Sequence, residues 1–89
     1  SERGKAPNDV RDGFYNIDGK IPCQPDGGLK CFGHPIGASG LRMMYEMYLQ
    51  LLGRAGERQL ENPRYGLTHN LGGFPPMNIC SIAIVGRYK

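Results

Sequence analysis

The stretch from Ala38 to Leu52 constrains the fold most, because its pattern predicts a helix that is apolar on nearly every side. Its main apolar stripe recurs at helical spacing and consists of Leu41, Met44, Tyr45, Tyr48 and Leu52. Further apolar residues lie off that stripe, namely Met43, Met47, Leu49 and Leu51. The only polar ridge is thin and is made of Arg42, Glu46 and Gln50.

A helix that is apolar nearly all round is buried on nearly all sides. The remaining residues of an 89-residue chain cannot supply that much cover. We therefore expect partner structure outside this sequence to cover the helix. The alternative interpretation is an ordinary core helix in an unusual small domain.

The chain divides by composition into residues 1–27 and residues 28–89. The first part carries Gly, Pro, Asp and Asn at close intervals, which predicts an extended loop region with one short strand near Phe14–Ile17. A loop this long is unusual in an isolated domain and is more typical of a segment draped over a larger body.

Residues 28–89 predict the order strand, glycine loop, helix, strand, glycine loop, strand. The first strand is expected at Gly28–Phe32, and the second at Arg64–Thr68, running into a loop at His69–Gly73. Ile79–Val85 has only Ser81 as a polar residue, which suits a strand covered on both faces. The pattern indicates an α/β fold in which a mixed sheet packs on a largely buried helix.

Composition excludes several classes of function. The net charge is only +3 and the basic residues are dispersed, which argues against nucleic-acid binding. No apolar run approaches the ~18–20 residues of a membrane span, and the polar start Ser1–Asp12 does not resemble a signal peptide. An odd set of three cysteines at irregular spacing favours a reducing compartment such as the cytoplasm.

The octet Gly33–Gly40 places a histidine among three glycines, directly before the predicted helix. The Pro35 ring would fit near the first helical turn, and the helix dipole would disfavour a positive charge on His34, leaving an imidazole able to act as a base. A phosphate-binding loop is a competing interpretation, although the octet lacks the Gly-Lys-Ser/Thr ending of a nucleotide P-loop. A plainly structural histidine bonded to a neighbouring carbonyl is the other alternative.

This octet, Gly-His-Pro-Ile-Gly-Ala-Ser-Gly, resembles the histidine motif near the C-terminus of thiolases. Pro25–Leu29 resembles the Asn-x-x-Gly-Gly lead-in of that family, with an aspartate where Asn or Ser is often found. Gly53–Gln59 and Leu67–Gly73 resemble the sterol-carrier-type branch, which includes archaeal acetyl-CoA acetyltransferases and benzylsuccinyl-CoA thiolases. The resemblance runs from about Asp12 to Arg87.

The resemblance implies an acyltransferase acting on acyl-CoA thioesters, by 3-ketoacyl-CoA thiolysis or Claisen condensation, through a nucleophilic cysteine. No residue here matches that cysteine, whose motif lies in the N-terminal half of the family fold. His34 is implied to activate it and to help bind the thioester oxygen. The backbone N–H of Gly72 is implied to form part of an oxyanion hole, and Gly33, Asn70 and Gly73 are implied to contact substrate.

Asn70 departs from the Cys-x-Gly-Gly loop of biosynthetic and degradative thiolases, in which a cysteine acts as acid and base. An amide cannot shuttle protons as a thiol does. In the sterol-carrier-type branch a cysteine of a His-Asp-Cys-Phe motif is implied to take over that role, and this motif does not occur in the sequence.

The cysteines and the second histidine of the chain invite other interpretations. Cys80 is expected to be a buried strand thiol and Cys31 a packing residue, while His69 is expected to be structural. The spacing of Cys23, Cys31 and His34 fits no compact zinc pattern, with or without His69, so we expect no metal site.

For the parent protein the resemblance implies a helix–sheet–helix–sheet–helix fold and a homo-oligomer. It implies coenzyme A as a substrate and no covalently bound cofactor. The remainder of the thiolase chain or a complementary subunit is the implied partner, and some relatives also work with a small partner protein that has a zinc site and an OB fold. The isolated chain would then be inactive. The alternative is a non-catalytic thiolase-derived module that binds acyl-CoA or acts as a scaffold.

Overall fold

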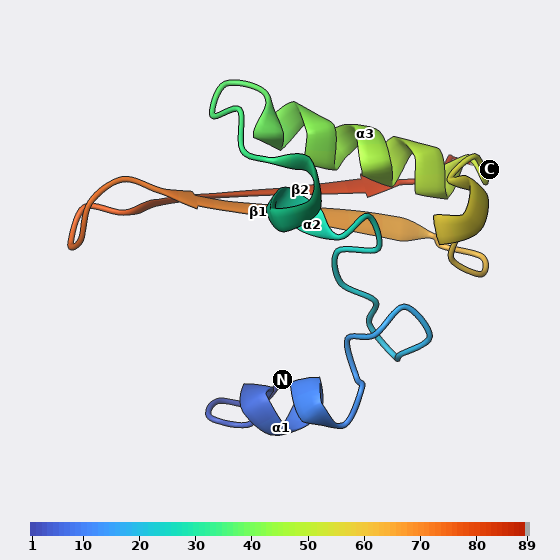
Figure 1. Cartoon of the computed structure of the whole chain (residues 1–89), viewed down its shortest axis with the longest axis horizontal. Helices are drawn as coiled ribbons and strands as arrows, with labels where there is room; N and C mark the ends of the chain where they lie inside the picture. Colours follow the sequence, from blue (N-terminus) through green and yellow to red (C-terminus); the bar gives the residue numbers. More distant parts are fainter. Residues whose placement is uncertain (89) are drawn as a thin grey trace. The chain divides into compact units, whose positions relative to one another are not determined.

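The computed structural model describes residues 1–88, which form two compact units with the division after Phe32. The first unit contains helix α1 (Ala6–Arg11), a series of turns and helix α2 (Gly28–Phe32) (Figure 1). The second unit contains helix α3 (Ser39–Leu51), a 3₁₀ turn η1 (Gly56–Arg58) and strands β1 (Tyr65–Gly72) and β2 (Ile79–Gly86).

The first unit differs from the predicted loop in that it contains a short helix. Pro7 lies in the first turn of α1 and Arg11 in the last, where a fixed φ and a positive charge respectively favour a helix. The strand predicted near Phe14–Ile17 is wrong, because this stretch folds into turns. The Ile21 N–H, for example, donates to the Phe14 carbonyl at 3.1 Å.

The strand predicted at Gly28–Phe32 is also wrong, because these residues form α2. The Asp26 carboxylate accepts a hydrogen bond from the Gly28 N–H at 3.0 Å, as a capping residue does at the start of a helix. A short apolar run is compatible with strand or helix, and its periodicity cannot separate the two. The hydrogen bond from the Gly28 N–H to Asp26 favours the helix over the strand here.

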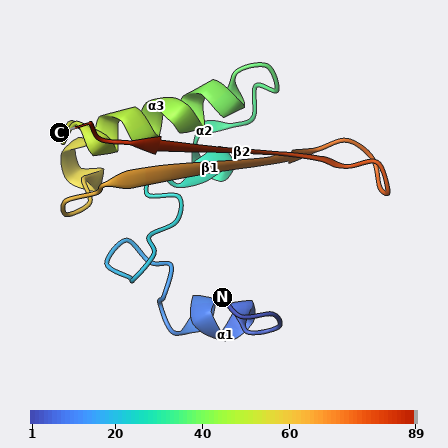
Figure 2. The ribbon, with the colours of Figure 1, turned by 180° about the vertical axis from the view of Figure 1, so that it is seen from behind.

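The second unit is a β-hairpin with α3 on one face, as Figures 1 and 2 show from opposite sides. The strands pair antiparallel, from Tyr65 opposite Gly86 to Gly72 opposite Ile79. The predicted central helix and final strand are confirmed. The α/β class is confirmed as well, although the sheet within residues 1–88 is two-stranded and antiparallel rather than mixed.

Strand β1 is longer than predicted, because His69–Gly72 continue the strand instead of forming a loop. These four residues pair with Ile79–Ile82, so the hairpin ladder satisfies their backbone polar groups. The loop starts at Gly73, whose φ of +95° favours glycine. The predicted turn at Phe74–Pro76 is present, and the Phe74 carbonyl accepts the Met77 N–H at 2.5 Å.

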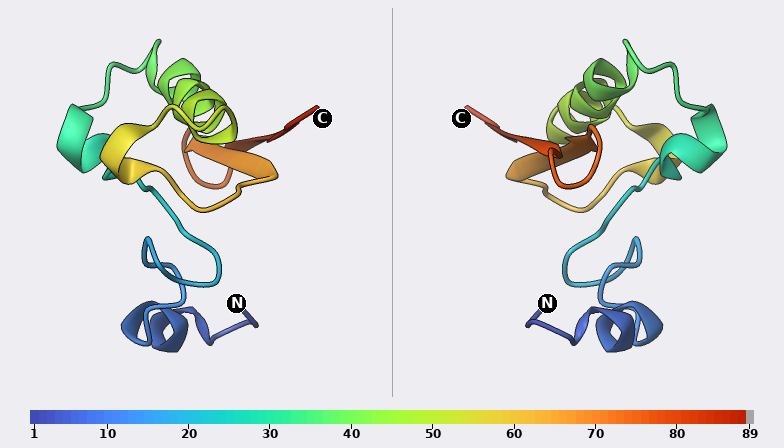
Figure 3. Two further views of the ribbon diagram at one scale, coloured as in Figure 1. Left: turned by 90° about the vertical axis from the view of Figure 1, so that its right-hand side faces the viewer. Right: turned by 90° about the vertical axis from the view of Figure 1, so that its left-hand side faces the viewer.

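From Tyr65 to His69 the residues of β1 alternate between exposed and buried, as the period of a strand requires, and α3 lies against one face of the hairpin (Figure 3). Thr68 is buried, and its hydroxyl lies 3.8 Å from Met44 Sδ. Gly66 is buried as well, and a Cβ at this position would lie 2.6 Å from Met47 Sδ and 2.9 Å from Met47 Cβ. Glycine at position 66 therefore allows the helix to lie close to the sheet.

We expect Gly66→Ala to destabilise the protein by ~1–3 kcal/mol, because the added methyl group overpacks this contact. Chemical denaturation of the variant and the wild type checks this. Adding Met47→Ala to the same chain should restore only part of the loss, since Met47 Cβ is itself one of the close atoms. Wild-type stability in the single variant would contradict a tight helix–sheet contact.

Within the described chain, helix α3 buries Glu46 and Gln50 of its polar ridge and exposes most of its apolar stripe. Glu46 and Gln50 are 5% and 3% exposed, whereas Leu41 is 74% exposed. The rings of Tyr45 and Tyr48 stack with centroids 6.4 Å apart, and both are more than half exposed. Among residues 1–88 the buried apolar side chains are only Leu51 and Ala55. The apolar stripe is therefore not what holds this unit together.

The buried polar ridge instead binds the segment that follows the helix. Glu46 accepts from Arg58 Nε at 3.2 Å and from Arg58 Nη2 at 3.0 Å. Gln50 Nε2 donates to Glu46 at 3.1 Å and to the Arg58 carbonyl at 2.8 Å, and Gln50 Oε1 accepts the Leu60 N–H at 2.9 Å. Gln59 donates to the Gln50 carbonyl at 2.9 Å. We call these four side chains, Glu46, Gln50, Arg58 and Gln59, the polar clamp.

The face of the hairpin that points away from α3 is apolar and open in the described chain. Its large exposed apolar residues are Tyr65, Leu67, Leu71, Ile82 and Ile84. Cys80 pairs with Leu71 and is exposed, so its predicted burial is wrong for this chain, and Cys31 is exposed as well. The prediction assumed a strand covered on both faces, and no described residue of the second unit covers this one.

Candidate functional site

His34 lies on the turn that leads into α3, with its side chain exposed. Its Nδ1 is 2.7 Å from the hydroxyl oxygen of Ser39, the first residue of the helix. The Ser39 hydroxyl also donates to the Pro35 carbonyl at 3.1 Å, and Ser39 is only 2% exposed. The imidazole is therefore held at one edge by a buried residue, while the rest of the ring is accessible.

The helix starts later than the proline suggested. Pro35 precedes α3 by four residues, and its carbonyl accepts the N–H groups of Ala38 at 2.8 Å and Ser39 at 2.9 Å. This turn uses the conformational freedom of Gly33, whose φ is +79°. His34 is thus tied to the start of the helix through Ser39 rather than by direct continuation of the chain.

Asn70 lies on the face of β1 that points toward α3. It is partly buried, and its Nδ2 would lie 3.9 Å from a Cβ placed on Gly40 in the first turn of the helix. Gly72 and Gly73 follow at the end of β1 and the start of the hairpin loop, and both are exposed. A Cβ on Gly72 would meet no atom of this chain within 4 Å.

The residues predicted for the site therefore gather at one end of the second unit. Ser39 contacts His34 while its neighbour Gly40 faces Asn70, so the first turn of α3 joins the two glycine segments. The hairpin loop extends from the same end in Figures 1 and 2. This end offers an accessible imidazole, an amide and glycine backbone. The Cys80 thiol is at this end too, opposite Leu71, but on the sheet face that points away from α3.

Ser39 belongs to the glycine-rich octet, but the sequence pattern alone assigns it no role. Its contact with His34 depends on the Pro35 turn, which no helix or strand period reveals. The usable signal was a small hydroxyl residue at the start of a helix, five positions after a histidine.

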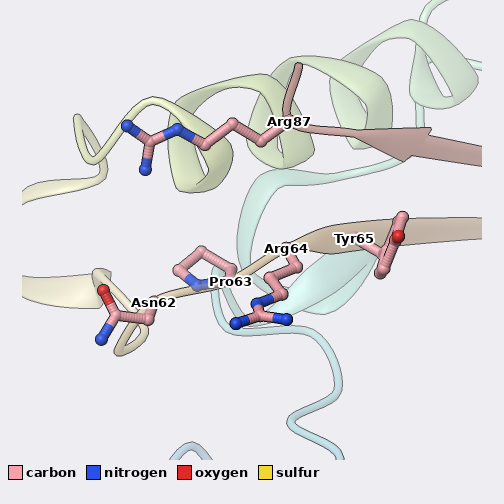
Figure 4. Close-up of a pocket in the computed structure, with 5 residues that line it drawn as sticks. All are labelled: Asn62, Pro63, Arg64, Tyr65 and Arg87. Atoms are coloured by element: carbon pink, nitrogen blue, oxygen red, sulfur yellow. The ribbon is translucent and has the colours of Figure 1, made fainter. Parts of the chain in front are cut away.

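A shallow cavity of about 390 Å³ lies at the other end of the hairpin, where β1 begins and β2 ends (Figure 4). It is lined by Asn62, Pro63, Arg64, Tyr65 and Arg87. None of the residues predicted for the site belongs to it. In the close-up the side chains of Arg64 and Arg87 point in different directions, so they do not converge on one position.

Within residues 1–88, no group of three or more His, Cys, Asp or Glu side chains is arranged to hold a metal ion. His69 lies on β1 opposite Ile82 and is exposed, on the sheet face that points away from α3. None of the helices in the described part of the chain combines the length and hydrophobicity of a membrane span.

Comparison with known proteins supports the resemblance found in the glycine segments. The family described as Thiolase C-terminal domain-like matches residues 1–87. The chain is 49% identical over 81% of its length to an acetyl-CoA acetyltransferase of Methanothermobacter thermautotrophicus, and 44% identical over 98% of its length to sterol carrier protein 2 of Oryctolagus cuniculus. It is 36% identical over 80% of its length to a benzoylsuccinyl-CoA thiolase subunit of Thauera aromatica.

The chain spans only 19%, 14% and 19%, respectively, of the lengths of these three relatives. The family match nevertheless covers almost every residue of the chain. The chain therefore belongs to the thiolase family, as a C-terminal domain-like segment.

Proposed function

We propose that this chain is part of a longer thiolase-type acyltransferase, to which it contributes a general base and part of an oxyanion hole. The observation that carries the proposal is the accessible imidazole of His34, held by buried Ser39 at the end of α3 where Asn70 also lies. Catalytic bases require this combination of a fixed orientation and access to the reacting group.

The proposed chemistry begins with proton transfer. His34 takes the thiol proton of a nucleophilic cysteine located elsewhere in the longer protein, and the resulting thiolate attacks the thioester carbonyl. The carbonyl oxygen gains negative charge, which the Gly72 N–H and the protonated imidazole stabilise. In the condensation direction the acyl group then stays on the cysteine, and coenzyme A departs as a thiol with the proton that His34 had taken. In thiolysis the thiolate attacks the keto carbonyl instead, and acetyl-CoA is the leaving group.

Asn70 is proposed to help orient the acyl group rather than to move protons. Its amide can donate and accept hydrogen bonds but does not titrate. Gly33 and Gly73 are proposed to let the backbone approach the substrate, and both have the positive φ that glycine tolerates.

The open apolar faces support a longer protein. The stripe with Leu41 and Tyr45 on α3, and the sheet face with Leu67 and Ile84, are larger than a small stable domain would leave exposed. The remainder of the thiolase chain is the proposed cover for both. Assembly into a homo-oligomer, a zinc- and OB-fold-containing partner protein and a cytoplasmic location remain proposals that rest on the family resemblance.

The test is thiolysis by the full-length protein. We expect it to consume coenzyme A and a 3-ketoacyl-CoA and to release acetyl-CoA together with an acyl-CoA shortened by one acetyl unit. The isolated chain should have no such activity. Full-length protein that binds acyl-CoA, as measured by calorimetry, but never cleaves or condenses it would instead support a non-catalytic binding module.

A further inference from the structure

We propose that Ser39 is a positioning residue that fixes the tautomer of His34, so that Nδ1 carries the proton and Nε2 is the basic nitrogen. The role of this nitrogen in catalysis rests on the proposed function. The tautomer itself is a property of the resting protein and can be measured without any turnover.

The assignment follows from counting protons. A serine hydroxyl has one proton to donate and two lone pairs to accept with. The Ser39 hydroxyl donates its proton to the Pro35 carbonyl at 3.1 Å, so only a lone pair remains for His34 Nδ1 at 2.7 Å. A contact this short between two heteroatoms requires a proton between them, and the imidazole must supply it. Nδ1 is therefore the protonated nitrogen.

Ser39 is well placed to enforce this arrangement. Its own N–H donates to the same Pro35 carbonyl at 2.9 Å, so the residue is tied to the turn through backbone and side chain. Its burial leaves water little access to the hydroxyl. Apart from His34 Nδ1 itself, the Pro35 carbonyl is the acceptor that the described chain gives this hydroxyl, and the proposal is that the hydroxyl proton stays on that carbonyl.

A hydroxyl also has an advantage over a carboxylate at this position. A carboxylate would fix the same tautomer but would favour the positively charged ring, which cannot accept a proton. The neutral Ser39 hydroxyl fixes the tautomer without adding charge. Once Nε2 has taken a proton, Nδ1 still donates to Ser39, and this hydrogen bond becomes stronger because its donor is then charged.

The first experiment is ¹⁵N NMR of the full-length wild-type protein with labelled histidine. The His34 signals are identified by their loss in a His34→Asn variant, and His69 serves as an exposed reference histidine. We expect Nδ1 of neutral His34 to give the shift of a protonated ring nitrogen and Nε2 that of an unprotonated one. The reverse pattern, or an even mixture of both tautomers, would overturn the inference.

The second experiment compares Ser39→Ala with Ser39→Thr, which keeps the hydroxyl. We expect Ser39→Ala to give a mixture of His34 tautomers and to lower kcat by ~10- to 100-fold, in the range found when groups that orient a histidine are removed. The KM for acyl-CoA should change little, and Ser39→Thr should keep the wild-type tautomer.

Turnover and tautomer in Ser39→Ala that match the wild type would refute the positioning role. If either Ser39 variant fails to fold, the wild-type spectrum alone still decides the question. A protein with the expected tautomer but no thiolase activity would leave this inference intact and contradict the proposed function instead.

Discussion

Replacing His34 with alanine in the full-length protein should lower kcat by at least ~10²-fold, because general-base catalysis contributes about that much or more to a proton transfer. The imidazole is the exposed, oriented titratable group at the candidate site, and its edge is fixed by Ser39. The loss should fall on acyl-enzyme formation, the step that requires a thiolate. Steady-state turnover measures kcat, and the pre-steady-state burst measures acyl-enzyme formation.

The same variant should also change the reactivity of the nucleophilic cysteine that the proposed function places elsewhere in the longer protein. A thiolate reacts with alkylating agents, whereas a thiol does so only weakly. Without His34 as a proton acceptor, the cysteine should be alkylated more slowly by iodoacetamide at neutral pH. This readout requires no substrate and therefore separates a lost base from a damaged substrate site.

His69→Ala is the matched control for this experiment. It removes the other histidine of the chain, which is also exposed but lies on the sheet face away from α3. Turnover per folded protein should stay within a few-fold of the wild type. Equal losses in both variants, or none in His34→Ala, would contradict the proposed role of His34.

The parts of the fold that sequence reasoning predicted correctly are those with long, regular patterns. The apolar period across Leu41–Leu52 is long enough to define α3, and the run Ile79–Val85 is long enough to define β2. The strand predicted at Gly28–Phe32 failed because five residues contain too little of either period. The Asp26 cap then favoured the helix.

The sequence pattern could not predict where β1 ends or which side of α3 is buried, and the reason is a different one. Asn70 and Gly72 have loop-like residue types, and only pairing with Ser81 and Ile79 keeps them in the strand. Glu46 and Gln50 belong to the thin polar ridge of the helix pattern, yet both are buried, because the segment after the helix folds back on them. Such choices depend on tertiary contacts that no local pattern contains.

The candidate site was predicted in part. The octet identified His34 and the Leu67–Gly73 segment identified Asn70, and the structure places both at the start of α3 through Ser39 and Gly40. Their roles stay predictions. The contact between Ser39 and His34 could not be predicted from the sequence, because the hydroxyl meets Nδ1 only when the turn at Pro35 is closed.

The polar clamp carries the second large expected effect, in the stability of the protein rather than in its chemistry. Gln50→Ala should lower the free energy of unfolding by ~2–4 kcal/mol, because each buried polar group that loses its partner costs about 1–3 kcal/mol. The substitution removes hydrogen bonds to Glu46, to the Arg58 carbonyl and from the Leu60 N–H. The partial exposure of Arg58 and Leu60 allows some recovery through water.

Two features make this variant a clean test. Alanine has a higher helix propensity than glutamine, so any destabilisation must come from the lost side-chain contacts rather than from the helix itself. Arg54→Ala provides the control, because its exposed side chain lies just past α3 and outside the clamp, and its effect should stay within ~0.5 kcal/mol.

Chemical denaturation of the full-length variants gives the change in stability, and amide hydrogen exchange gives its location. In Gln50→Ala the Leu60 N–H should exchange much faster than in the wild type, because its acceptor is gone. Exchange should also rise at Ala55, whose N–H donates to Gln59 at 3.0 Å within the same folded-back segment. Unchanged exchange at both amides would mean that the apolar cover supplied by the rest of the protein, and not the clamp, holds this segment against α3.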